Sequence, residues 1–232
     1  MKNKDTSTLT QNIHFQKILA NPVVVIAGNW LLQGMRYMET GERYLKIACT
    51  LIPSLVIIFI IIKIRGRIIL SEAIISCMVG HTLNWIFNGH LFVLLRYFPI
   101  KGRMTLEKME LFIHDLHRRS EGADFLQAIL IFGSFSRGEI GSTSDLDVRV
   151  MRQKGIWKAF KAYGFAIELR FMALIKGFPL DIYAFGDVNY LGRLREDEHP
   201  VIVVDNGFVA KYYDNYLNYK EILNKLKFRN EQ

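Results

Sequence analysis

Apolar residues divide the chain into two unlike parts. Two long apolar stretches occupy residues 45–64 and 73–95, and each has enough residues to cross a hydrocarbon core of about 30 Å. In the first stretch the charges lie only near the ends, at Lys46 and Lys63. This pattern predicts a transmembrane helix, in which the single Pro53 is tolerable. The two stretches together predict a helical membrane hairpin.

Small and polar residues recur along the second stretch. Ser76, Gly80, Asn84 and Asn88 are four residues apart, so they share one face of a helix. Such a face is typical of a seam between membrane helices, and it favours packing against the first helix or a homodimer through the second. A polar site for a lipid-linked substrate is the alternative. A third interpretation places this segment in the membrane interface.

The segments around the hairpin define the expected domains. Residues 1–44 are expected to form a cytosolic or interfacial segment, in which the short apolar run 22–35 predicts a buried or interfacial helix. Residues 45–98 would hold the membrane helices. Residues 99–232 alternate short apolar runs with helical periodicity. The order strand, turn, strand, helix, strand predicts an α/β (α+β) domain, in which helices flank a mixed sheet.

A glycine and a serine follow the first predicted strand of this domain. The run 128–132 is short and apolar, as expected of a buried strand. Gly133 lets the backbone turn sharply and approach a ligand. Ser134 offers a hydroxyl and an N–H where a helix can begin, and helix N-termini hold phosphates.

Acidic residues occur at the next two predicted strands. Asp145 and Asp147 are two residues apart on a strand-like run, so both carboxylates should share one face. Neighbouring carboxylates repel one another, which makes the pair costly unless a cation lies between them. Mg²⁺ prefers oxygen ligands of this kind and also bridges phosphates. Asp181 interrupts another apolar strand-like run and is the candidate third acid; the alternative is an Asp that bonds only to the backbone.

The stretches IFGSFSRGE and SDLDVRV resemble the nucleotidyltransferase (DNA polymerase β-like) superfamily, and within it the minimal nucleotidyltransferases. One departure is Ser136, where a small Ala is usual. The resemblance implies a nucleotidyltransferase fold and two Mg²⁺ ions, with Mn²⁺ as an alternative. It makes Asp145, Asp147 and Asp181 the catalytic and metal-binding residues. It assigns nucleotide binding to Gly133, Ser134, Arg137 and Ser144.

The resemblance also implies a reaction. A nucleoside monophosphate would pass from a nucleoside triphosphate, ATP by default, to an acceptor hydroxyl, with release of pyrophosphate. The membrane segments point to an envelope, lipid-linked or membrane-protein acceptor, which the sequence does not identify. Two alternatives are an antitoxin-like protein adenylyltransferase and a catalytically silent membrane subunit that uses the fold for docking.

The excess of positive over negative charge lies entirely in residues 1–103. The net charge is +8, yet residues 104–232 hold 18 basic and 18 acidic residues, so this part is neutral. This distribution argues against a nucleic-acid partner and favours interaction with anionic membrane lipid. Six basic residues flank the outer ends of the two apolar stretches, and three lie in the connecting loop. The positive-inside rule then predicts a cell-membrane protein whose catalytic domain faces the cytoplasm.

Overall fold

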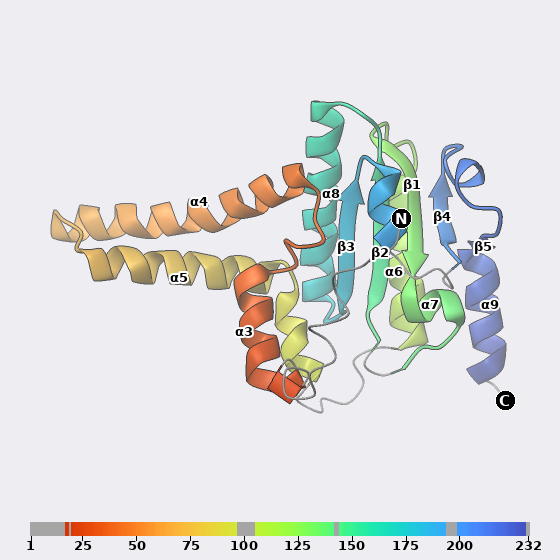
Figure 1. Cartoon of the computed structure of the whole chain (residues 1–232), viewed down its shortest axis with the longest axis horizontal. Helices are drawn as coiled ribbons and strands as arrows, with labels where there is room; N and C mark the ends of the chain where they lie inside the picture. Colours follow the sequence, from red (N-terminus) through yellow and green to blue (C-terminus); the bar gives the residue numbers. More distant parts are fainter. Residues whose placement is uncertain (1–16, 19, 97–104, 142–143, 194–198, 231–232) are drawn as a thin grey trace.

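The C-terminal part of the chain forms a five-stranded mixed sheet (Figure 1). The computed structural model describes residues 17–18, 20–96, 105–141, 144–193 and 199–230. The strand order is β3-β2-β1-β4-β5, with bounds β1 Leu126–Phe132, β2 Leu146–Arg152, β3 Leu180–Phe185, β4 Val201–Asp205 and β5 Leu217–Asn218. β1 is antiparallel to β2 and to β4, whereas β2 is parallel to β3 and β4 is parallel to β5. The mixed sheet and the α+β class are thus confirmed.

The predicted order of elements around the first three strands is also confirmed. The short helix α7 (Gly133–Arg137) follows β1, and α8 (Ile156–Ile175) connects the parallel strands β2 and β3. α8 continues through Gly164 without a break. Thr105 caps α6 (Leu106–Ser120), because its hydroxyl accepts a hydrogen bond from the N–H of Lys108 at 3.2 Å.

The sheet has a hydrophobic core on each face. Alternate residues of β1 point to opposite faces, and Ile129 and Ile131 pack with the buried sides of α6, α8 and α9 (Tyr219–Asn230). On the opposite face, Ala128 and Leu130 belong to a second core. This second core includes residues of η2 (Val188–Arg193) and η3 (Val209–Lys211), and also Met38 from the N-terminal segment. The N-terminal segment is therefore part of the domain core.

The two apolar stretches form a helical hairpin that projects from the side of the domain where α8 and β3 lie (Figure 1). α4 spans Thr40–Arg65, and α5 spans Leu70–Phe87. Of the helices among the described residues, α4 is the one long and apolar enough to cross a membrane by length and composition. α4 begins before the predicted start at residue 45 and continues through Pro53.

The second apolar stretch does not form the single run 73–95 that the sequence suggested. α5 ends at Phe87, and the chain continues from His90 as the 3-10 helix η1 (His90–Arg96). The break has a local cause. The Asn88 side chain donates to the carbonyl of Asn84 at 2.9 Å, and Gly89 adopts a positive φ of 75°. The boundary expected near residue 99 lies outside the described residues.

The polar face of α5 packs against α4 within one chain. Asn84 donates to the hydroxyl of Thr50 at 2.8 Å and to the carbonyl of Lys46 at 3.1 Å. Gly80 lies so close to α4 that an added Cβ would overlap with the hydroxyl of Ser54. The seam interpretation is therefore confirmed, with the first helix as its partner. A homodimer through α5 remains a prediction.

An exposed apolar helix lies beside the base of the hairpin (Figure 1). α3 spans Pro22–Leu32, and Asn21 caps it by accepting a hydrogen bond from the N–H of Val23 at 2.9 Å. No residue of α3 is buried, although most of its side chains are apolar. The helix therefore lies at the surface of the chain rather than in its core, and its position in a membrane interface stays a prediction.

Candidate active site

Gly133 makes the turn that joins β1 to α7, and it lies directly against Asp147. Its φ is +72°, in the left-handed region that favours glycine. A Cβ at this position would overlap with Oδ2 of Asp147. The strand arrangement explains this contact, because Phe132 and Asp147 are partners in the antiparallel pairing of β1 with β2. The predicted turn and the predicted acid thus meet at one end of the sheet.

Asp147 and Asp181 lie side by side on neighbouring parallel strands. They are register partners in the pairing of β2 with β3. Asp145 comes just before β2 and is exposed, and it lines the same cavity as Asp181. The tertiary structure therefore gathers the three predicted acids at one end of the sheet, from two elements that are separate in sequence.

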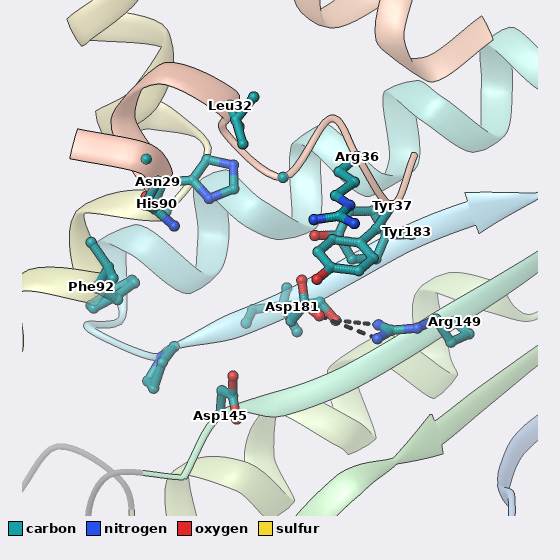
Figure 2. A pocket seen from close by; sticks show the side chains of 16 residues that line it. Asn29, Leu32, Arg36, Tyr37, His90, Phe92, Asp145, Arg149, Asp181 and Tyr183 are labelled. Atoms are coloured by element: carbon teal, nitrogen blue, oxygen red, sulfur yellow. Dashed lines mark hydrogen bonds and ion pairs between the residues drawn. The ribbon is translucent and has the colours of Figure 1, made fainter. Parts of the chain in front are cut away.

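Arg149 is a site residue that the sequence interpretation missed. Its guanidinium lies 3.2 Å from Oδ2 of Asp181 and 3.7 Å from Oδ1 of Asp147, and it also donates to the carbonyl of Asp181 at 3.0 Å (Figure 2). The side chain is only 11% exposed, and its guanidinium lies over the ring of Tyr183. The strand alternation was the available signal, because Arg149 is two residues beyond Asp147 on the same face.

The negative charge of the acids is only partly compensated. Burial, followed by the charges of Asp181 and Asp145, raises the pKa of Asp147 to about 7, although Arg149 acts in the opposite direction. The carboxylates of Asp147 and Asp181 share one buried guanidinium, that of Arg149. A carboxyl group that resists ionisation in this way would be stabilised in its charged form by a further cation.

The acids suit a hard divalent cation in ligand type, since all three supply carboxylate oxygens. However, the three carboxylates do not converge as closely as the ligands of a complete metal site. Among the described residues, no group of three or more His, Cys, Asp or Glu side chains gathers closely enough to hold a metal ion. Arg149 forms an ion pair with the carboxylate of Asp181, which a metal ion would also need as a ligand. Asp145, Asp147 and Asp181 supply the ligand type that Mg²⁺ prefers, but their carboxylates would have to move closer together, and Asp181 away from Arg149, to hold the ion.

The four predicted nucleotide-binding residues lie around the turn that follows β1 or just before β2. The Ser134 hydroxyl oxygen is buried and has no hydrogen-bond partner among the described residues. Arg137 forms an ion pair with Glu139 at 3.2 Å. Ser144 accepts a hydrogen bond from the N–H of Gly141 at 2.9 Å, which orients the segment leading into Asp145. A buried hydroxyl without a partner is costly, so Ser134 is the strongest of these candidates for a ligand contact.

A cavity of about 930 Å³ opens beside Asp181 and Asp145 (Figure 2). One wall comes from the acidic end of the sheet, through Arg149, Asp181 and Tyr183. The other wall comes from the N-terminal part, through α3, the segment that follows it, and η1. The sequence did not indicate this second wall, because its residues lie more than 50 positions away from the acidic motif.

Two ion pairs, one half-buried and one buried, hold the N-terminal part against the domain that contains the sheet. Glu39 pairs with Arg152 at 2.9 Å and also accepts a hydrogen bond from the hydroxyl of Tyr163 at 2.9 Å. At the start of α4, Glu42 pairs with Arg170 of α8 at 2.6 Å, and both side chains are almost fully buried. Pairs this buried require close, defined packing of the two parts. The hairpin therefore has a set position relative to the acids.

The site combines three carboxylates, a partnerless buried hydroxyl beside a glycine turn, and a cavity bounded by the base of the hairpin. This arrangement suits the binding of a cation and a polyanionic ligand next to a second, larger ligand. No protein-family model, no curated protein and no solved structure matches this chain.

Proposed function

We propose that this protein is a membrane-anchored nucleotidyltransferase, which transfers a nucleoside monophosphate from a nucleoside triphosphate to an acceptor hydroxyl. The observation that carries the proposal is the contact of the Gly133 turn with Asp147, whose register partner is Asp181. A phosphate-binding turn and two carboxylates on adjacent strands are the parts that this reaction requires.

The triphosphate would lie on the Gly133 side of the acids. Ser134 has the buried hydroxyl without a partner, and Gly133 makes the positive-φ turn that brings this segment against Asp147. Arg137 and Ser144 lie at the outer edge of this side and would contact the phosphates from there. Asp145, Asp147 and Asp181 would hold two Mg²⁺ ions, which neutralise phosphate charge and favour in-line displacement when bound.

The acceptor would lie on the Asp181 side. Asp181 is the acid farther from the turn, since β3 lies beyond β2 in the sheet order. Its carboxylate would take the proton of the acceptor hydroxyl as the hydroxyl oxygen forms a bond to the α-phosphorus. The bond from the α-phosphorus to the bridging oxygen breaks, and pyrophosphate leaves with that oxygen. Arg149 holds Asp181 in place through its carboxylate and its carbonyl.

The proposed location is the cytoplasmic face of the cell membrane. α4 would cross the bilayer, and α5 would pack along it through the polar seam. The cytoplasm contains nucleoside triphosphates and Mg²⁺, in agreement with the orientation that the positive-inside rule predicts. The acceptor would be an envelope or lipid-linked molecule, or a membrane protein.

The test is label transfer by the full-length protein in membranes. The protein is incubated with Mg²⁺, each of the four α-labelled nucleoside triphosphates, and a membrane extract. We expect label in a membrane component, and we expect its loss in Asp145→Ala and in Asp147→Asn. Asp214→Asn is the matched control, because Asp214 is an exposed aspartate outside the site. Label in protein rather than in lipid would favour the protein adenylyltransferase.

A catalytically silent docking subunit is the second candidate, and Arg149 is the observation that favours it. The guanidinium lies between Asp147 and Asp181 and supplies part of the charge that a metal ion would supply. In a silent subunit this pairing would be permanent. The absence of transfer with every nucleotide, together with unchanged stability on addition of Mg²⁺, would favour this candidate over the enzyme.

A further inference from the structure

The cavity of about 930 Å³ lies on the Asp181 side of the acids, away from the Gly133 turn. Its lining includes Leu180, Asp181 and Tyr183 of β3, together with Asp145, but neither Gly133 nor Ser134. The triphosphate side and the cavity therefore lie on different sides of Asp147. A ligand in the cavity would present its reactive group to Asp181, opposite the proposed phosphates.

The cavity has a free positive charge on the wall away from the acids. Arg36 lines it and is exposed, and no carboxylate among the described residues forms an ion pair with it. Figure 2 shows Arg36 and Tyr37 together above Asp181. Guanidinium suits the oxygens of a phosphate, and an exposed tyrosine offers a flat, partly polar surface to a sugar or polyol. These two side chains favour a ligand that carries both groups.

The same cavity is continuous with apolar surface. Leu32 of α3 and Phe92 and Val93 of η1 contribute to its lining. Leu32 is 49% exposed, and Leu31 beside it is 61% exposed, so the apolar face of α3 extends outward from the cavity. If a lipid headgroup occupied the cavity, the apolar tail of the lipid could therefore extend along α3.

The cavity also lies close to the predicted membrane boundary. Tyr37 precedes the start of α4 at Thr40, and the exposed aliphatic side chains of α4 begin at Ile47. Ile47 is seven residues beyond Thr40, which corresponds to about 10 Å of helix. Because ion pairs hold α4 to α8, this separation is set by the fold. With α4 across the bilayer, as proposed above, the cavity would lie at the depth of the lipid headgroups.

We propose that this cavity binds the acceptor, and that the acceptor is a membrane lipid whose headgroup joins a phosphate to a polyol or sugar. Arg36 binds the phosphate, Tyr37 packs against the polyol or sugar, and one hydroxyl reaches Asp181. The lipid tail leaves along α3. This assignment rests on the proposed function for its reaction, whereas the binding of the lipid stands on the cavity alone.

Binding is tested with short-chain lipids and the full-length protein in detergent micelles. The probes are dihexanoyl phosphatidylglycerol and dihexanoyl phosphatidylinositol, with dihexanoyl phosphatidylcholine as the lipid that lacks headgroup hydroxyls. We expect calorimetry to show about tenfold tighter binding of the two polyol lipids, and a loss of about tenfold in Arg36→Gln and in Tyr37→Ala. Tyr216→Ala is the matched control, because Tyr216 is exposed and does not line the cavity.

Three binding results would overturn the assignment. Equal affinity for all three lipids would remove the headgroup specificity. Unchanged affinity in both cavity variants would place the lipid elsewhere. Free glycerol 3-phosphate that binds as tightly as the lipids would identify a soluble acceptor instead.

Transfer is then measured with the same lipids and an α-labelled nucleotide. We expect Arg36→Gln and Tyr37→Ala to raise the KM for lipid about tenfold without changing the KM for nucleotide. If lipid binds at the cavity and no nucleotide is ever transferred, the proposed function fails and the cavity assignment survives. If transfer occurs to a protein and lipid does not bind, the cavity assignment fails and the nucleotidyl transfer survives.

Discussion

Asp147 stands beside Asp181 because the two residues are register partners on the parallel strands β2 and β3. The guanidinium of Arg149 lies within 3.7 Å of the Asp147 carboxylate and within 3.2 Å of the Asp181 carboxylate. This relationship concentrates negative charge that one arginine does not fully balance. Experiments can determine whether this charge binds a cation and which residues hold the carboxylates in place.

The contribution of Asp147 to protein stability should fall as pH rises when divalent metal is absent. The pKa of Asp147 is about 7 in the folded chain and returns toward its ordinary value of 3.8 on unfolding. Between these values the folded state binds more protons than the unfolded state, so the free energy of unfolding falls as pH rises through this window. The loss is at most about 4 kcal/mol, because one pKa unit corresponds to about 1.4 kcal/mol.

Thermal melts in EDTA from pH 4 to pH 8 measure this dependence, and Asp147→Asn should flatten it. Addition of Mg²⁺ should raise the melting temperature more at pH 8 than at pH 5, because the ion requires ionised carboxylates. Equal slopes for the wild type and the variant would contradict the burial of an ionisable Asp147.

Gly133→Ala should abolish transfer and destabilise the fold. The new Cβ would overlap with Asp147, and the positive φ is strained for alanine. We expect a loss of about 1–3 kcal/mol in denaturant unfolding and a loss of at least about 100-fold in transfer rate. Gly164→Ala is the matched control. It lies in α8 with open space around it, so it should stabilise the protein by about 0.5–1 kcal/mol and leave activity intact.

Removal of Arg149 should make stability depend more strongly on divalent metal. Arg149→Met leaves the carboxylates of Asp147 and Asp181 without their guanidinium, and the variant should be less stable in EDTA. Because a cation can then replace the lost charge, Mg²⁺ should restore a larger share of stability in the variant than in the wild type. Differential scanning fluorimetry with and without Mg²⁺ measures both effects. A variant that Mg²⁺ does not rescue would support the silent subunit.

The buried ion pair of Glu42 with Arg170 joins the hairpin to the domain, and it should stabilise the fold more than an exposed ion pair does. Arg170→Met leaves the Glu42 carboxylate buried without its partner, which should cost about 3–5 kcal/mol. The double variant Glu42→Leu with Arg170→Met should recover most of this loss, and a double-mutant cycle measures the coupling. Glu168→Gln is the control, because the exposed pair of Glu168 with Arg119 should contribute less than about 1 kcal/mol. Equal losses at both sites would contradict a specific buried link.

Much of the local structure followed from the sequence pattern. The order of strands and helices from Leu126 to Phe185 was predictable, because alternation and helical periodicity act over a few residues. The polar seam of the hairpin was predictable too, since residues four apart share a helix face. The end of α5 at Phe87 was missed, because it depends on the Asn88 hydrogen bonds and the positive φ of Gly89 rather than on hydropathy.

The sequence by itself determined which functional groups lie at the end of the sheet. These groups are a glycine turn and the carboxylates of Asp145, Asp147 and Asp181. These residues stand in local patterns, and short-range sterics and strand alternation specify where each side chain points. Only the tertiary structure decided that Arg149 bonds to the acids and that Arg36 and Tyr37 face them across a cavity. Those relationships join segments far apart in the chain, and they depend on buried ion pairs such as Glu42 with Arg170 that form only when the whole domain packs.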